Sequence, residues 1–122
     1  MARILLVVSD LHCGSEVGLM PPEAEIRTGN RIGFGGNVHQ EWLWHCWTDL
    51  QSQFARIRGK DRYALLLNGD LTEGVHHKSI EALTQSVEDH ANMAIAAVGG
   101  LAGKAEKSFV TLGTEVHTGL IE

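Results

Sequence analysis

Two apolar runs, each followed at once by an acidic residue, are the clearest feature of the hydrophobic pattern. The first run predicts a strand over residues 3–9, directly before Asp10 and His12. The second predicts a strand over residues 63–69, directly before Asp70. Continuous apolar runs of this length are typical of strands that are buried on both faces of a parallel sheet.

Helical spacing and a third apolar run account for much of the remaining chain. A helix is predicted over residues 38–58, with Gly59 as its end and one apolar face made of Leu43, Trp47, Leu50, Phe54 and Ile57. A second helix is predicted to begin at the N-cap Ser79 and to end at Gly99-Gly100. A third strand is predicted over residues 108–112, and the glycine-rich segment 13–38 is predicted to be a long loop.

The order strand, helix, strand, helix, strand predicts an α/β fold with a small parallel sheet, flanking helices and right-handed crossovers. With 122 residues, the chain is expected to form a single domain. If both helices cover the same face of the sheet, the other face is bare. A bare apolar face would favour dimers or higher oligomers.

Composition and charge exclude few classes of function. The net charge of −5 argues against a broad basic surface for nucleic acid, although a bound metal would reverse the charge locally. Cys13 and Cys46 do not form a C-x-x-C pair, and both are expected to be reduced thiols. The apolar run of residues 4–8 is too short for a signal peptide or a membrane span, so a cytoplasmic protein is expected.

Asp10, His12 and Asp70 are the candidate metal ligands. Each follows a predicted strand of a parallel sheet, and ligands bind beyond the carboxyl ends of such strands, so these side chains are expected to converge. Two carboxylates and an imidazole suit a divalent ion such as Mn, Fe, Zn, Ni or Mg. The alternative is that the two aspartates simply cap turns after the strands, where aspartate is common.

The sequences Asp10-Leu11-His12 and Gly69-Asp70 resemble the first two signatures, D-x-H and G-D, of the calcineurin-like metallophosphoesterase family. The resemblance implies metal-dependent phosphatase or phosphodiesterase activity at a dinuclear site, with Asp70 bridging the two ions. It covers nearly the whole chain but only the N-terminal half of the family's αββα sandwich. It therefore implies that a C-terminal half or a second copy of the chain covers the sheet, and that this chain alone has little activity.

The third family signature, G-N-H-[DE], is expected after the third strand. The chain has Gly113-Thr114-Glu115-Val116-His117 there, which is similar to phage-type members of the family. Threonine stands at the position of the metal-binding asparagine, and Glu115 stands at the position of the catalytic histidine. The resemblance therefore makes His117 the candidate general acid, while Thr114 and Glu115 stay open as replacements for the usual pair.

Further polar residues beside the two strand ends are candidates for contact with substrate or with the metal ligands. These are Asn68, which directly precedes Gly69-Asp70, and His76 and His77, which are equally well explained as solvated loop residues. Trp47 is expected in the core, and Trp42 or Trp44 is expected to cover the long loop or a partner.

Two other functions stay open at this stage. One is a non-catalytic metal-binding or oligomeric scaffold module that retains the half-fold. The other is a nucleotide-binding α/β domain, although no glycine-rich turn leads from a strand into a helix. The substrate class is equally open, because nucleic acid, nucleotide, phosphoprotein and small diester all contain phosphoester bonds.

Overall fold

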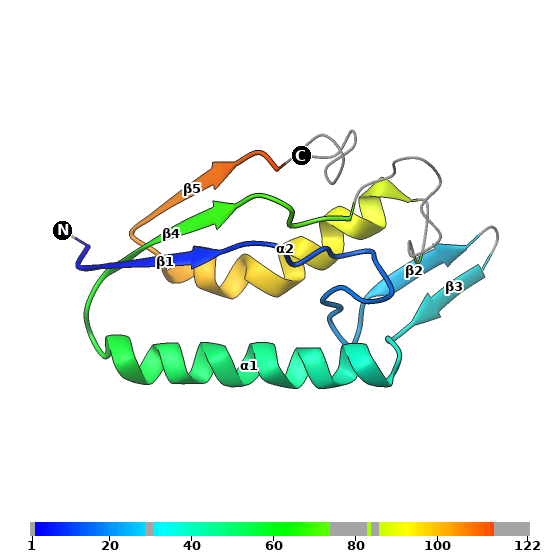
Figure 1. Ribbon diagram of the computed structural model, residues 1–122, viewed down its shortest axis with the longest axis horizontal. Coiled ribbons are helices and arrows are strands. Elements are labelled where there is room, and N and C mark those ends of the chain that lie inside the picture. The colour runs from blue at the N-terminus through cyan, green and yellow to red at the C-terminus, as the bar shows by residue number, and fades with distance from the viewer. Residues whose placement is uncertain (1, 29–30, 74–82, 84–85, 114–122) are drawn as a thin grey trace.

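The computed structural model describes residues 2–28, 31–73, 83 and 86–113 (Figure 1). Its helices and strands follow one another along the chain as β1 (Ile4–Val8), β2 (Glu25–Thr28), β3 (Arg31–Phe34), α1 (Val38–Arg58), β4 (Tyr63–Asn68), α2 (Val87–Lys104) and β5 (Lys107–Thr111). Neither described helix is both long enough and apolar enough to cross a membrane.

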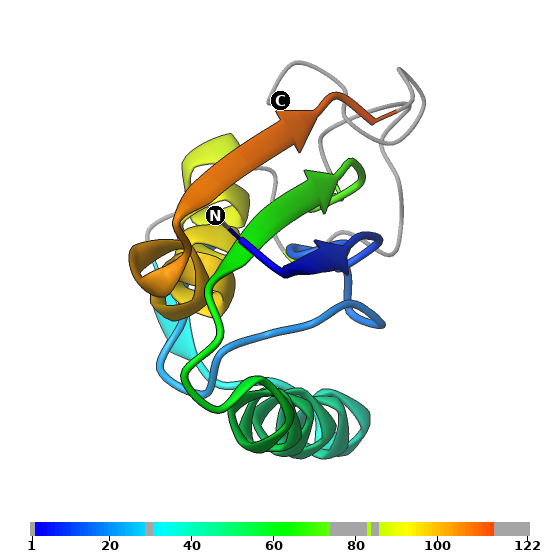
Figure 2. The same cartoon turned by 90° about the vertical axis from the view of Figure 1, so that its left-hand side faces the viewer.

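A three-stranded sheet with the order β1-β4-β5 forms the centre of the fold, and both of its strand pairs are parallel. The predicted α/β class is confirmed, and the architecture is consistent with half of an αββα sandwich. Figure 2 shows α1 and α2 on the same side of the sheet. The core lies between the sheet and these helices, with Leu65 of β4 and Met93 of α2 almost fully buried in it.

The opposite face of the sheet is open, so the prediction of strands buried on both faces is wrong. Along β1 the side chains alternate, and Leu5 and Val7 are 59% and 50% exposed. The strand register places Val7 beside Leu66 and Leu66 beside Phe109, which form an apolar row on this open face. The reason is the strand order, because successive crossovers in one direction carry both helices to the same face.

We expect the open face to cause self-association. Static light scattering of the purified chain should report dimers or larger species, because an exposed apolar sheet face of several hundred Å² drives association. Phe109→Lys, on an edge strand, should shift the population toward monomer, whereas Val38→Lys at the exposed start of α1 should not. A stable monomer at high protein concentration for the unmodified chain would contradict this expectation.

The segment predicted as a long loop contains a β-hairpin. Strands β2 and β3 pair antiparallel, with Glu25 opposite Phe34 and Thr28 opposite Arg31. The signal was present in the sequence, since only Gly29-Asn30 separates the two strands and such pairs are typical of two-residue hairpin turns. The surrounding glycines and the Pro21-Pro22 pair concealed it.

Helix α1 has the predicted bounds. Asn37 caps it through its side chain, which accepts a hydrogen bond from the Gln40 backbone N–H, and Gly59 ends it with a φ of 53°. The predicted apolar face is only partly correct, because Leu50 and Ile57 are 48% and 79% exposed. The side that packs on the molecule is rotated by part of a turn and runs through Gln40, Leu43, Trp44, Trp47, Gln51, Phe54 and Arg58.

Helix α2 starts later and ends later than predicted. Its N-cap is Ser86, whose hydroxyl accepts a hydrogen bond from the Asp89 N–H, whereas Ser79 lies outside the described residues. The helix continues through Gly99 and Gly100 to Lys104, because the last turn is held by tertiary contacts. Leu101 is buried there, and its carbonyl accepts a hydrogen bond from the Tyr63 hydroxyl. These contacts offset a cost of about 1 kcal/mol for each helical glycine.

Candidate metal centre

The parallel pairing of β1 with β4 continues past the ends of both strands. The Asp10 N–H donates to the Gly69 carbonyl (3.2 Å), and the His12 N–H donates to the Asp70 carbonyl (3.1 Å). Further along, the Cys13 N–H donates to the Leu71 carbonyl, and the Glu73 N–H donates to the Cys13 carbonyl. The two segments that carry the candidate ligands are therefore held side by side by their own backbones.

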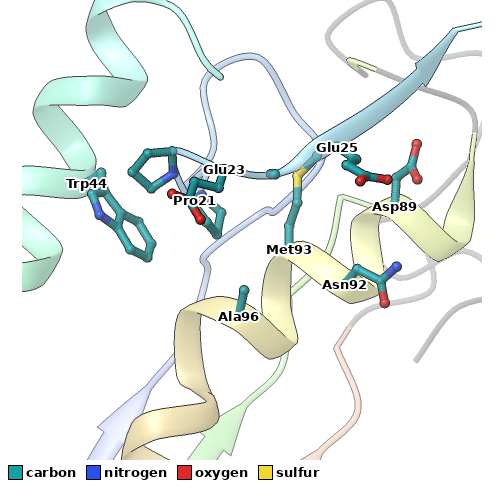
Figure 3. A pocket seen from close by; sticks show the side chains of 10 residues that line it. Pro21, Glu23, Glu25, Trp44, Asp89, Asn92, Met93 and Ala96 are labelled. Atoms are coloured by element: carbon teal, nitrogen blue, oxygen red, sulfur yellow. The ribbon is translucent and has the colours of Figure 1, made fainter. Parts of the chain in front are cut away.

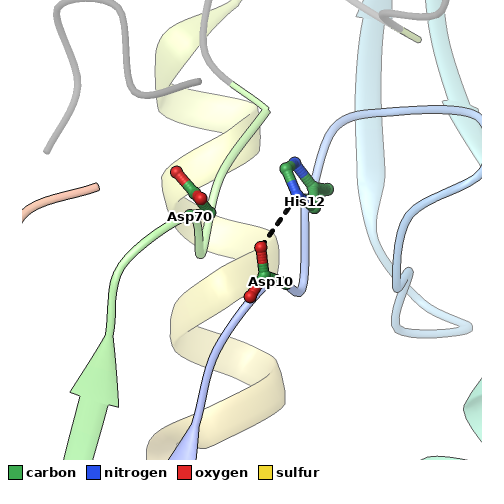
Figure 4. Close-up of side chains that lie close together, drawn as sticks. All are labelled: Asp10, His12 and Asp70. Carbon is green, nitrogen blue, oxygen red and sulfur yellow. Dashed lines mark ion pairs between the residues drawn. The ribbon is translucent and has the colours of Figure 1, made fainter. Parts of the chain in front are cut away.

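This pairing brings the three predicted metal ligands together, as Figure 4 shows. Asp10, His12 and Asp70 each offer a ligand atom, and these atoms all lie within 4.8 Å of one another. His12 Nε2 lies 3.5 Å from Asp10 Oδ1. Two ligands that each lie about 2.0–2.2 Å from an ion are at most roughly 4.4 Å apart, so small side-chain rotations suffice to bind one ion. The donor set and the geometry both fit a divalent metal.

The same three residues have an unusual backbone conformation. The φ angles are 58° at Asp10, 46° at His12 and 54° at Asp70, and no other non-glycine residue in the described ranges has a positive φ. This left-handed region costs an ordinary L-residue roughly 1–2 kcal/mol, although Asp and His tolerate it better than most. Strain of this kind gathers at functional sites, where the surrounding structure holds it in place. The clustering makes simple turn-capping a weaker explanation of the two aspartates.

Glu73 orients the histidine of this group. Its Oε2 lies 3.1 Å from His12 Nδ1, and an ionised carboxylate can only accept, so the Nδ1–H of His12 donates. The other ring nitrogen, Nε2, lies on the side of Asp10, where it could serve as a ligand. Carboxylates commonly orient metal-binding histidines in this way. Glu73 is not among the residues predicted from the sequence, although its position three residues after Asp70 was an available signal.

The electrostatics of the site favour an ionised Asp10. A hydrogen bond from the Ser9 side chain is the main cause that lowers the pKa of the Asp10 carboxyl, and the nearby His12 and Asp70 side chains lower it further. Desolvation is the second-largest cause and raises the pKa of this carboxyl, but the net shift is downward. A carboxylate in its charged form is the species that binds a cation.

The loop that follows His12 is anchored from both sides. Gly14 packs directly on the buried His90 ring, since a Cβ at Gly14 would lie 2.3 Å from it. The Gln40 side chain, at the start of α1, donates to the carbonyls of Ser15 (2.9 Å) and Gly18 (3.1 Å). The wall behind the candidate ligands is therefore fixed by α2 on one side and by α1 on the other.

Both cysteines are free thiols, as predicted, and they differ in environment. Cys13 is completely buried, and burial raises the pKa of its thiol to about 12. It is therefore protonated and inert near neutral pH. Cys46 is exposed on α1.

The other predicted site residues are not part of this group of ligands. Asn68 is exposed at the end of β4, where its Oδ1 accepts a hydrogen bond from the Thr111 hydroxyl (3.0 Å) and joins β4 to β5. The predictions for His76, His77, Thr114, Glu115 and His117 fall outside the described residues. Gly113, which begins the third signature, does reach this edge of the sheet, since a Cβ on Gly69 would lie 2.9 Å from its Cα.

Comparison of the chain with protein-family models, with curated proteins and with solved structures found no match. The resemblance to metallophosphoesterases therefore rests on Asp10-Leu11-His12 and Gly69-Asp70 themselves, on their position after two paired parallel strands, and on the convergence of their side chains.

Two cavities on the surface of the described structure are large enough to hold a small molecule, and one of these two contains candidate ligands. The larger, of about 660 Å³, lies between the loop after β1 and helix α1, and Asp10, His12 and Glu73 line it. The other, of about 550 Å³, lies between Trp44, the segment 21–25 and α2, and none of the predicted site residues line it (Figure 3). Trp44 thus faces the segment that was predicted as a long loop, as expected for one of the tryptophans. We take the first cavity as part of the candidate site.

Proposed function

We propose that this chain provides a divalent-metal centre that hydrolyses phosphoesters, as a phosphatase or a phosphodiesterase. The observation that carries the proposal is the convergence of Asp10, His12 and Asp70 within 4.8 Å at the ends of two paired strands. Their shared left-handed backbone supports it, because strain at all three residues of one group is better explained by ligand binding than by packing.

The donor atoms of each residue determine the role that we propose for it. Asp10 and His12 would hold a first ion, and Asp70 would bridge to a second ion because a carboxylate has two oxygens. Glu73 would orient His12 for metal binding through Nε2 by accepting the hydrogen bond of Nδ1. Divalent ions in such a site supply Lewis-acid stabilisation of the phosphoryl group and activation of water. Mn, Fe, Zn, Ni and Mg all suit this donor set.

His117 is the proposed general acid that protonates the leaving oxygen, with Glu115 and Thr114 as the alternatives on the same segment. Imidazole side chains ordinarily titrate near neutral pH, whereas glutamate side chains are ordinarily ionised there and are poor proton donors. The open sheet face is the proposed contact for a C-terminal half of the sandwich or for a second copy of the chain.

The proposal predicts metal-dependent hydrolysis of bis-p-nitrophenyl phosphate. Mn should bind in isothermal titration calorimetry and support release of p-nitrophenol, and EDTA should abolish that release. His12→Ala should lose both properties, because a ligand is removed, whereas His45→Ala on the exposed side of α1 should retain both. Release of p-nitrophenol that persists in EDTA or in His12→Ala would overturn the proposal.

A non-catalytic scaffold is the second candidate, and the open apolar sheet face is the observation that favours it. A stable oligomer that binds Mn without hydrolysing the diester would support the scaffold, since the metal would then have a structural role.

A further inference from the structure

The cavity beside the metal ligands has walls of two kinds. Its polar end is formed by the ligands Asp10 and His12 and by Glu73. The rest is mostly apolar and is formed by Leu11, Val17, Leu19, Leu43, Trp47 and Leu50, with Ser15, Gly18 and Cys46 between them. The volume of about 660 Å³ lies in the range of small-molecule sites. A molecule held at the metal ligands would therefore extend directly onto an apolar surface.

We propose that this cavity binds the organic group of the phosphoester substrate, and that this group is uncharged, apolar and aromatic. The inference rests on the proposed function, because the phosphate is assigned to the ions held by Asp10, His12 and Asp70. It adds the substrate class: a small aryl-type phosphoester, as opposed to a nucleic-acid chain or a polyphosphate.

The charges around the cavity support this choice. None of the described residues that line it is a lysine or an arginine, while Asp10 and Glu73 are acidic. Recognition of a nucleic-acid backbone relies on lysine and arginine side chains that neutralise successive phosphates. A single phosphate at the ions, followed by an uncharged group, is compatible with this lining.

The walls are also fixed in place before any ligand binds. The indole N–H of Trp47 donates to the Ala97 carbonyl of α2 (3.1 Å), which holds the ring against the core. The Gln40 side chain holds the loop that carries Val17, through its bonds to the flanking Ser15 and Gly18 carbonyls. A preformed apolar site loses little conformational freedom on binding.

The cavity also accounts for apolar side chains that folding leaves in water. Leu50 belongs to the predicted apolar face of α1 and lines the cavity together with Leu43 and Trp47, and it is half exposed. Val17, on the opposite loop, is exposed as well. An aromatic ring between them would remove both side chains from water, which is favourable in proportion to the apolar area covered.

Cys46 provides a direct test that does not depend on turnover. It lines the cavity and is exposed, whereas Cys13 is buried, so a thiol reagent such as 5,5′-dithiobis(2-nitrobenzoate) should report on Cys46 alone. In the presence of Mn, phenylphosphonate at about ten times its Kd should slow this reaction about tenfold, by occupancy of the cavity. Methylphosphonate and inorganic phosphate should leave the rate within about twofold, because they lack the ring.

A matched pair of variants on α1 completes the test. Leu50→Gln should weaken protection by phenylphosphonate and raise KM for aryl esters, with Mn affinity unchanged. Ile57→Gln, exposed on the same helix outside the cavity, should change neither. Mn binding without protection, or equal protection by phenylphosphonate and inorganic phosphate, would overturn the cavity assignment alone. Absence of Mn binding would instead overturn the proposed function.

Discussion

Asp70→Asn is expected to weaken Mn binding by more than about 100-fold and to abolish hydrolysis of bis-p-nitrophenyl phosphate. Loss of residues that merely orient metal ligands costs about 10–100-fold in affinity, and the loss of a bridging ligand should exceed that. Asparagine has nearly the same shape as aspartate and tolerates a positive φ, so the φ of 54° at this position should be kept. A loss of Mn binding in this variant would therefore result from the missing negative charge.

The measurement is calorimetric titration of Mn into the variant and the unmodified chain. Asp61→Asn, in the exposed segment before β4, is the matched control and should bind Mn normally. His76→Ala should have a much smaller effect than Asp70→Asn, because only Asp70 is expected to bridge. If Asp70→Asn binds Mn within about threefold of the unmodified chain while its melting curve is unchanged, Asp70 is not a ligand.

Gly14→Ala is expected to destabilise the fold by about 2–6 kcal/mol. Gly14 has a φ of 105°, a conformation that costs an L-residue about 1–3 kcal/mol. The new methyl group would also lie 2.3 Å from the ring of His90, which is completely buried and cannot move aside freely. Overpacking of this kind costs a further 1–3 kcal/mol or so.

Urea unfolding followed by circular dichroism would measure this effect. Gly100→Ala is the control, since its Cβ meets no atom within 4 Å, and it should stabilise α2 by about 0.5–1 kcal/mol. In the double variant Gly14→Ala, His90→Ala, the steric contribution to the destabilisation would be removed and the contribution of the strained backbone would remain. A free energy of unfolding for Gly14→Ala within about 1 kcal/mol of the unmodified chain would show that the loop adjusts easily, in contrast to the overpacking argument.

The elements that depend on local patterns were predictable from the sequence. The bounds of α1 follow from helical spacing, a cap at Asn37 and a stop at Gly59, all of which act within a few residues. The convergence of Asp10 and Asp70 was predictable too, because parallel strands end at one edge of a sheet whatever their side chains are.

Features set by contacts between distant segments were not predictable in the same way. The continuation of α2 through Gly99-Gly100 depends on Leu101 and on the Tyr63 hydroxyl, which comes from another element. The exposure of Leu5 depends on which face of the sheet the helices cover. A continuous apolar run does not distinguish a strand that is buried on one face from a strand that is buried on both. Glu73 became recognisable only when its contact with His12 was seen.

The backbone hydrogen bonds beyond β1 and β4 also set when the candidate metal centre can form during synthesis of the chain. Asp10 and Asp70 are sixty positions apart in the sequence, and their backbones meet only after α1 has crossed between the strands. Until β4 has left the ribosome and paired, His12 has no neighbouring carbonyl at Asp70 to fix its position. Such long-range parallel pairing is slow relative to helix formation. Capture of the proposed metal would therefore be a late step, and an ion that binds only the native state would hold the completed strand pair together.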